Sequence, residues 1–441
     1  MATTTDLPQR EEGFYVVITG ANSGVGFAIG CRLIDEFLQT HPQEQSLVLI
    51  ITTRNKSKGD ATIKLLKQHL DKVCRRFEVD IPGVSALLQR RVIFRQEVLD
   101  LSSLISIQKL SKRLHETVPK LDAVICNAGI GGWEGVNFGK AIWLILTDWK
   151  NAMTWPTFKR SGVGWRTKPQ ITTSGKGKEI EEPVLGDVFC ANLFGHYCFG
   201  HYLAPLLANH ARSEHTRGRL IWVSSLEAYD YAFDLNDFQG LSSTQPYESS
   251  KRLTDLLAIS STFPSTAPLV DQYLGHTEDT AQTTKPRIYI SHPGICGTSI
   301  MTLNVILEYL MFLAMYIARW LGSEWHTVEA YKGACSMVWL VLAKQSTLDA
   351  MESQEGVGKW GSATDWWGRE RVDRTEVDGW GWGGILGEKT RKKGRHPHAK
   401  DLSKEDKQTF EKTGKSCWAE MEKLRLEWEA RLNDAGVGVR M

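Results

Sequence analysis

A tyrosine and a lysine four residues apart, Tyr247 and Lys251, lie in the stretch Tyr-Glu-Ser-Ser-Lys. If this stretch begins a helix, the phenol and the ammonium stand one turn apart on the same face. A free phenol ionises near pH ~10 and exchanges protons poorly at neutral pH, whereas a neighbouring positive charge lowers its pKa. The pair could therefore serve general acid–base catalysis. The same spacing is typical of an ordinary surface pair, so the surrounding elements must decide between the two interpretations.

A glycine-rich turn near the N-terminus has the setting of a phosphate-binding loop. Residues 14–18 form an apolar, β-branched run that predicts a strand, and a helical pattern follows through Ile29 and Phe37. The turn between them, residues 19–26, carries three glycines. Glycines here let the backbone approach a pyrophosphate, whose charge suits the helix N-terminus. The alternative is a plain turn without a ligand.

The residue after the second predicted strand bears on which dinucleotide could bind. That strand, residues 47–52, is followed by Arg54, with Lys56 and Lys58 beyond it. An acidic residue at this place would receive the ribose 2′-hydroxyl of NAD, whereas an arginine accommodates the 2′-phosphate of NADP. The acid is missing, so the sequence favours NADP(H), unless these cations are merely solvated.

Further strands alternate with helices, which predicts an α/β fold with a doubly wound parallel sheet, the Rossmann fold. Polar or small residues follow the ends of the predicted strands, where ligands of such sheets bind. They are Asp100 after residues 91–98, Asn127 after 121–126, Ser224 and Ser225 after 219–223, and Pro293 with Gly294 after 287–291. A helix predicted from Pro183 carries Asn192 among apolar residues, where an asparagine has poor propensity and would normally face water.

Changes in composition divide the chain into three parts. Residues 1–12 are polar and do not resemble a signal peptide. Residues 13–387 contain the predicted catalytic domain, with a Thr-rich surface loop expected at 261–284. Residues 388–441 predict a basic linker and a charged helix, which Ser403 and Asp406 would cap.

Two segments interrupt the alternation of strands and helices. An insertion at about 130–182, rich in glycine and tryptophan, is expected on the substrate side of the sheet, and an apolar flank follows at about 300–321. Glu308 within the flank disfavours a helix that spans a membrane. The flank predicts either a helix lying in a membrane interface or a buried helix at the entrance of the site.

The overall composition excludes some classes of partner. The 441-residue chain has a net charge of +2, which gives no electrostatic case for nucleic acid binding. Its eight cysteines form no C-x-x-C pair, so we expect buried free thiols, as at Cys31, Cys126 and Cys190, and no metal site. Sixteen tryptophans are typical of membrane interfaces and binding clefts or, equally, of packed subdomains.

These motifs together occur in the order and on the elements of one enzyme family. Residues 14–342 resemble the short-chain dehydrogenase/reductases. More narrowly, residues 247–257, 321–332 and 359–364 are similar to segments of the fungal 3-ketosteroid reductases of ergosterol biosynthesis. The resemblance implies NADPH-dependent reduction of the 3-keto group of C-4-demethylated sterols to the 3-hydroxysterol. It also implies sterol C-4 demethylation enzymes as partners and peripheral attachment to the cytosolic face of the endoplasmic reticulum membrane or to lipid droplets.

The resemblance assigns a role to each candidate residue. Tyr247 would give a proton to the sterol ketone, and Ser225, or alternatively Ser224, would hydrogen-bond the same oxygen. Lys251 would lower the pKa of the tyrosine and hold the nicotinamide ribose, and Asn192 would anchor a water that links the lysine to bulk solvent. The residues expected to bind the cofactor are Gly20, Ser23, Gly24, Val25, Gly26, Arg54, Asp100, Asn127, Tyr247, Lys251, Pro293, Gly294 and Thr298.

Two other functions remain open from the sequence. The chain could reduce another hydrophobic carbonyl, such as a retinoid or a fatty ketone, because motifs shared by a whole superfamily do not separate these substrates. It could also be a nucleotide-binding scaffold of a sterol-demethylating complex. The separation of Ser225 from Tyr247 exceeds what is usual in the wider family.

Overall fold

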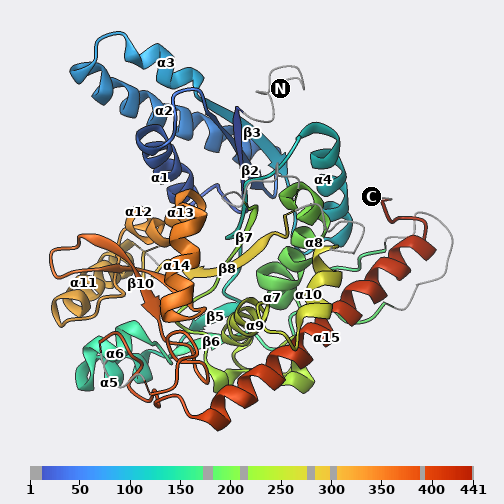
Figure 1. Ribbon diagram of the computed structural model, residues 1–441. Coiled ribbons are helices and arrows are strands. Elements are labelled where there is room, and N and C mark those ends of the chain that lie inside the picture. Colours follow the sequence, from blue (N-terminus) through green and yellow to red (C-terminus); the bar gives the residue numbers. More distant parts are fainter. Residues whose placement is uncertain are drawn as a thin grey trace.

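A central sheet of eight strands carries helices on both faces (Figure 1). The computed structural model describes residues 12–171, 182–208, 217–275, 284–297, 305–387 and 393–439. The strand order is β10-β9-β8-β7-β4-β1-β2-β3, and each adjacent pair is parallel except β9 with β10. The strands are β1 (Gly13–Ile18), β2 (Ser46–Thr53), β3 (Val92–Val98), β4 (Ala123–Cys126), β7 (Arg219–Val223), β8 (Arg287–His292), β9 (Lys359–Thr364) and β10 (Glu370–Thr375).

The predicted doubly wound α/β fold is confirmed by this arrangement. The chain runs outward from β1 to β3 in one direction and from β4 to β9 in the other, so the order reverses between β1 and β4. The helices are α1 (Gly24–Thr40), α2 (Lys56–Asp80), α3 (Val84–Arg90), α4 (Leu104–Thr117), α7 (Asp187–Phe189), α8 (Gly195–Ala208), α9 (Pro246–Ser260), α10 (Ala267–Leu274), α11 (Val305–Trp320), α12 (Ala330–Gly333), α13 (Cys335–Leu342), α14 (Gln345–Glu355) and α15 (Lys404–Asp434). Ligands of such sheets bind at the carboxyl ends of the strands, near this reversal.

Both faces of the sheet are buried, which explains why its inner strands read as nearly continuous apolar runs. Val16 and Ile18 of β1 point into a core formed with α1, α2 and α13. Tyr15 and Val17 point the other way, into a core formed with α4, α8, α9 and α15. All eight cysteines are free thiols and seven are buried, which confirms the expectation from their spacing.

Two regions differ from the sequence predictions. Residues 261–284, predicted as a surface loop, contain α10, because Val270, Tyr273 and Leu274 bury one of its sides. Gly275 then ends the helix in the left-handed conformation, at a φ of +61°. Strands β9 and β10 extend the sheet beyond the predicted strands, because their mixture of glycine, charged and polar residues hides the strand pattern.

The insertion forms a small unit of its own. Strand β5 (Trp133–Val136) pairs antiparallel with β6 (Lys159–Ser161), and helices α5 (Phe138–Thr147) and α6 (Trp149–Thr154) lie between them in the chain. Asn137 and Asp148 cap the two helices by accepting hydrogen bonds from backbone N–H groups. Within the described part of the chain, no helix is both long enough and apolar enough to cross a bilayer.

The C-terminal helix α15 packs along the body of the protein (Figure 1). Ser403 and Asp406 form the expected capping box at its start. Gly414 lies so close to α9 that a Cβ there would meet Cβ of Ser260 at 2.7 Å. Trp418, fully buried, donates a hydrogen bond of 3.1 Å from Nε1 to the carbonyl of Leu257. The helix therefore supports the element that carries Tyr247.

Candidate active site

Tyr247 and Lys251 lie one turn apart on α9, as the sequence predicts. Lys251 is buried, and its Nζ donates a hydrogen bond of 2.8 Å to the carbonyl of Val223 at the end of β7. The same nitrogen lies 5.6 Å from the centre of the Tyr247 ring. Burial lowers the pKa of Lys251 to about 8, and the positive charge of Lys359 adds to this effect. Lys251 is thus mostly charged at pH 7.

The pKa of Tyr247 is raised, whereas the sequence predicts that Lys251 lowers it. Burial raises the pKa, and the negative charge of Glu227 raises it further, while a hydrogen bond with Ser225 acts in the opposite direction. The physical reason is that the protein partly removes the phenol from water, while Lys251 gives its hydrogen bond to Val223. Tyr247 therefore keeps its proton at neutral pH, which is the state that a donor to a ketone needs.

The structure separates the two serines that follow β7. Ser224 is buried, and its hydroxyl donates a hydrogen bond of 2.5 Å to Oδ1 of Asp255. Ser225 is only half-buried, and its Oγ accepts the backbone N–H of Glu227 at 3.1 Å. Since only Ser225 also interacts with Tyr247, the geometry favours Ser225 as the hydroxyl that could reach a substrate oxygen.

Asn192 lies in a single π-helical turn, Cys190–Phe194, between α7 and α8. Its side chain does not face water: Oδ1 accepts the N–H of Ile130 at 2.7 Å, and Nδ2 donates to the carbonyl of Ile130 at 3.0 Å. Nδ2 also lies 3.2 Å from Oγ of Ser250 on α9. These bonds explain a polar residue in mid-helix, and π-helical turns are frequent at functional sites. The role of Asn192 in holding a water stays a prediction.

A buried histidine connects the glycine turn with this helix. His196 lies 2.8 Å from Oγ1 of Thr19 through Nε2 and 3.2 Å from the carbonyl of Asn192 through Nδ1. Burial lowers the pKa of His196 to about 3, so its ring is neutral and can donate at one nitrogen and accept at the other. Thr19 in turn accepts the backbone N–H groups of Asn127 and Ala128. Sequence reasoning missed His196, which lies in an apolar helix without a motif of its own.

The glycine turn fits a close approach of phosphate to the backbone. Gly20 and Gly24 have positive φ angles of +65° and +53°, and a Cβ on Gly26 would meet the carbonyl oxygen of Gly20 at 2.2 Å. Ser23 is the exposed N-cap of α1, and its side chain caps no backbone N–H group. Val25 is half-buried in the first turn. The N–H groups at the start of α1 are therefore available to an anion, as a pyrophosphate requires.

Three further cofactor candidates follow the ends of adjacent strands. Arg54, after β2, is exposed and forms no hydrogen bond or ion pair with the described residues. Asp100, after β3, is half-buried, and its Oδ1 accepts the N–H of Ser102 at 3.1 Å. Asn127, after β4, donates from Nδ2 to the carbonyl of Thr19 at 3.0 Å. All three lie at the strand ends where a dinucleotide would bind.

Pro293 and Gly294 follow β8 at the same edge of the sheet. Gly294 has a φ of +68°, and a Cβ there would meet the carbonyl oxygen of Trp325 at 2.4 Å. No other residue fits this turn without moving the backbone. Thr298, the remaining cofactor candidate, lies outside the described residues.

Groups that sequence reasoning did not single out surround Tyr247. The ring of Trp133 lies 5.1 Å from the Tyr247 ring, centre to centre. Nζ of Lys159 lies 5.5 Å from the same ring centre, pairs with the carboxylate of Glu227 and is 3.8 Å from Oε1 of Glu248. Burial raises the pKa of Glu248 to about 7, and the charge of Glu227 adds to this effect. The insertion thus contributes a tryptophan and a cation to the site, and no local motif marks either of them.

Comparison with known proteins gives close relatives over most of the chain. It is 46% identical over 439 residues to 3-keto-steroid reductase erg27 of Aspergillus fumigatus, covering 96% of this chain and 95% of that protein. It is 37% identical over 462 residues to 3-keto-steroid reductase ERG27 of Gibberella zeae, covering 96% of each. The protein of the same name in Schizosaccharomyces pombe is 30% identical, covering 82% of this chain and 90% of that one. No family model matches the chain.

Among solved structures, the RhlG/NADP active-site complex of Pseudomonas aeruginosa aligns with a TM-score of 0.40 and 15% identity, covering 76% of this chain and 90% of that one. The sequence relatives decide the assignment, since they cover 82–96% of this chain at up to 46% identity. The chain belongs to the 3-keto-steroid reductase family.

Proposed function

We propose that this protein reduces the 3-keto group of a C-4-demethylated sterol to the 3-hydroxysterol in ergosterol biosynthesis, with NADPH as reductant. The observation that carries the proposal is the 46% identity over 96% of the chain to a protein named 3-keto-steroid reductase. The site supports it, because a half-buried phenol, a hydroxyl and a lysine meet beside a glycine turn that fits a dinucleotide.

The chain's own residues would bind the ketone and deliver a proton. Bound NADPH supplies the hydride. Tyr247 keeps its proton at neutral pH and would pass it to the carbonyl oxygen, while the Ser225 hydroxyl hydrogen-bonds that oxygen as negative charge develops. Lys251 would place a positive charge beside the phenolate that remains, and Asn192 would hold the water that returns a proton to it.

A tyrosine substitution tests the reaction directly. We expect Tyr247→Phe to slow reduction of a 4-demethylated 3-keto sterol by about 10²-fold or more, because the proton donor is lost. Tyr231→Phe is the matched control, since Tyr231 is exposed and near in sequence. An unchanged rate in Tyr247→Phe would show that the phenol is not the donor. Activity confined to a retinoid or fatty ketone in the same assay would overturn the sterol substrate.

The preference for NADPH rests on Arg54. An exposed arginine after β2, without a partner among the described residues, is suited to a 2′-phosphate. We expect Arg54→Asp to raise KM for NADPH at least ~10-fold and to leave KM for NADH nearly unchanged, because only NADPH carries the phosphate. Lys64→Asp, an exposed change of the same charge on α2, is the control. Equal losses with both cofactors would contradict the contact.

The place of the reaction is also a proposal. Because a sterol ketone dissolves in lipid, we place the protein peripherally on the cytosolic face of the endoplasmic reticulum membrane or on lipid droplets, beside the sterol C-4 demethylation enzymes. Fractionation of cells expressing the tagged chain, with pull-down of those enzymes, tests both statements. Recovery of the protein free of membranes and partners would overturn them.

A further inference from the structure

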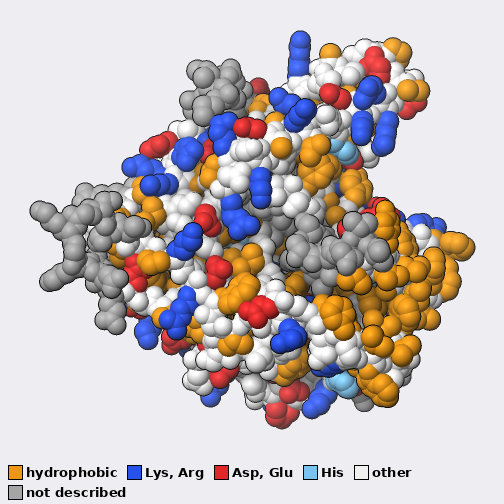
Figure 2. Space-filling view, turned by 180° about the vertical axis from the view of Figure 1, so that it is seen from behind, with side chains coloured by type: hydrophobic (Ala, Val, Ile, Leu, Met, Phe, Trp, Pro, Cys, Tyr) orange, Lys and Arg blue, Asp and Glu red, His pale blue; other side chains and the backbone are white. Residues whose placement is uncertain are grey.

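We infer that α5, α11 and the turn between β9 and β10 form one apolar face, which docks on a phospholipid bilayer and receives the sterol ketone from it. This inference rests on the proposed sterol substrate. Figure 2 shows a broad hydrophobic area on one side of the molecule, at the lower right of that view. The segments that form it come from the insertion, the apolar flank and the end of the sheet, far apart in the sequence.

Helix α5 exposes large apolar side chains that no other described element covers. The exposed fractions are 60% for Phe138, 60% for Ile142, 68% for Trp143 and 77% for Leu146. The one charged residue of α5 is Lys140. Its Nζ donates a hydrogen bond of 2.9 Å to the carbonyl of Thr157, in the segment that leads to β6. A solvated helix would place charged side chains on this side.

Helix α11 and the turn of residues 365–369 continue this apolar face. Tyr309, Leu310 and Leu313 are 73%, 54% and 52% exposed, and Trp366 and Trp367 are 55% and 76% exposed. Aromatic side chains of this kind are enriched where a protein meets the boundary between lipid and water. A monomeric soluble protein rarely leaves so many large apolar residues together in water.

The three segments are joined to one another. Trp149 of α6, the helix after α5, donates a hydrogen bond of 3.2 Å to the carbonyl of Ala314 on α11. In the turn, a Cβ on Gly368 would lie 2.5 Å from Nη1 of Arg319, the buried arginine near the end of α11. Arg319 is 4% exposed and donates to the carbonyls of His326 and Thr327, so its positive charge does not lie on the apolar face.

The length of α11 sets how it can lie in a membrane. Its 16 residues span about 24 Å, less than the ~30 Å of a bilayer's hydrocarbon core. Glu308, exposed near its start, would also be costly inside that core. The helix is therefore suited to lie in the interface plane, with α5 beside it.

Both helices connect the apolar face with the candidate active site. Trp133, whose ring contacts Tyr247, begins the strand that leads directly into α5. Phe312 of α11 packs against the loop after β8, where a Cβ on Gly297 would lie 2.3 Å from the phenylalanine ring. A sterol that leaves the lipid between these helices would meet Tyr247, and this continuity favours a lipid surface over a protein partner.

Flotation of the full-length protein with phosphatidylcholine vesicles tests the inference. We expect Trp143→Glu with Leu146→Glu, and separately Leu310→Glu with Leu313→Glu, to lower the bound fraction at least ~10-fold, because charges oppose insertion. Val79→Glu with Leu87→Glu adds the same charge at exposed apolar positions on α2 and α3 and should bind like the unchanged protein. If either test pair binds vesicles as well as the unchanged protein does, α5 and α11 do not act together as one membrane-docking face.

The same variants separate this inference from the proposed reaction. With the ketone delivered in cyclodextrin, we expect all variants to keep their rate, whereas with the ketone in vesicles the two test pairs should lose at least ~10-fold. Inactivity of the unchanged protein in both assays would refute the reaction itself. Light scattering gives the remaining outcome: if the test pairs change the oligomeric mass and leave vesicle binding unchanged, the face joins two copies of the chain and the inference is wrong.

Discussion

Helices α15 and α5 are both additions to the doubly wound sheet. The tryptophans of α15 are buried, whereas that of α5 is exposed. Trp418 and Trp428 of α15 are 0% and 2% exposed, packed into the core with α8, α9 and α10. Trp143 of α5 is 68% exposed. The chain thus covers one apolar flank with its own C-terminal helix and leaves the other open. This contrast fits a stabilising role for α15 and the lipid contact that we propose for α5.

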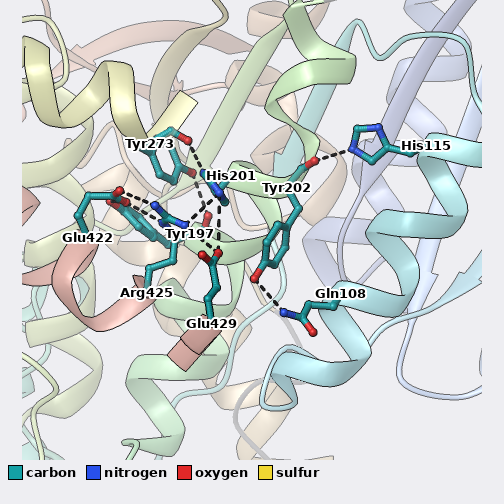
Figure 3. A network of polar contacts seen from close by, with 9 residues as sticks. All are labelled: Gln108, His115, Tyr197, His201, Tyr202, Tyr273, Glu422, Arg425 and Glu429. Carbon is teal, nitrogen blue, oxygen red and sulfur yellow. Dashed lines mark hydrogen bonds and ion pairs between the residues drawn. The ribbon is translucent and has the colours of Figure 1, made fainter. Parts of the chain in front are cut away.

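Helix α15 also takes part in a network of polar contacts with the rest of the protein (Figure 3). Glu422 accepts a hydrogen bond of 2.6 Å from the Tyr197 hydroxyl, and Arg425 donates to the same carboxylate at 2.7 Å. Arg425 also binds Glu429 at 2.7 Å and lies 3.0 Å from Nε2 of His201. Buried charges held by several partners are costly to disturb. The exposed side of α5 has no comparable network among the described residues.

The largest effect on stability should come from Trp418→Ala. Removing this fully buried indole leaves a cavity between α15, α9 and Tyr273, and we expect a loss of about 3–5 kcal/mol in the free energy of unfolding. Urea denaturation followed by circular dichroism measures it. A loss below ~1 kcal/mol would mean that α15 is not part of the cooperative core, and the contrast with α5 would fail.

Two glycine substitutions should then have opposite signs. Gly414→Ala places a methyl group 2.7 Å from the Ser260 side chain, so we expect α15 to shift away from α9 at a cost of about 1–3 kcal/mol. Gly139→Ala in α5 meets nothing closer than 3.8 Å and should stabilise by a few tenths up to ~1 kcal/mol, because alanine favours helix. Thermal unfolding measures both changes. Equal signs would show that α15 and α5 are packed alike.

Much of α15 could be predicted from the sequence, and much of the site could not. Local chemistry marks the Ser403 cap, the glycine turn and the pair of Tyr247 with Lys251, because each depends on neighbours within a few residues. Lys159 approaches Tyr247 only because β6 pairs with β5, and Lys359 meets Asp255 at 2.7 Å only through the placement of β9. Contacts between distant segments leave no local pattern, so sequence reasoning placed neither lysine beside the site.

The buried ammonium of Lys159, in the insertion, should affect chemistry more than folding. Lys159 compensates Glu227 and Glu248, whose charges raise the pKa of Tyr247, so Lys159→Gln should raise that pKa further and Glu227→Gln should lower it. Oxidation of the 3-hydroxysterol needs the phenolate, and a higher pKa means less phenolate at a given pH. At a fixed alkaline pH we expect slower oxidation in Lys159→Gln and faster oxidation in Glu227→Gln, up to ~10-fold for each pKa unit.

Arg160→Gln is the control for Lys159, since Arg160 is the next residue of β6 and is exposed. A strand turns successive side chains to opposite faces, so this change should leave the oxidation rate unaltered. If oxidation slows in both Lys159→Gln and Glu227→Gln, the substitutions damage folding, and the proposed electrostatic effect on the pKa of Tyr247 is contradicted. Arg425 pairs with Glu422 and Glu429 on α15. Arg425→Gln should therefore change the free energy of unfolding without changing the pH dependence of sterol oxidation.

The smallest effect on unfolding should come from Trp143→Ala. Its indole is mostly in water, so we expect a change within about 0.5 kcal/mol, against several kcal/mol for Trp418→Ala. Denaturation without vesicles, under the conditions used for Trp418→Ala, measures the difference. A loss as large as that of Trp418 would mean that α5 packs on the protein in solution, and its exposed apolar side would then need no lipid to explain it.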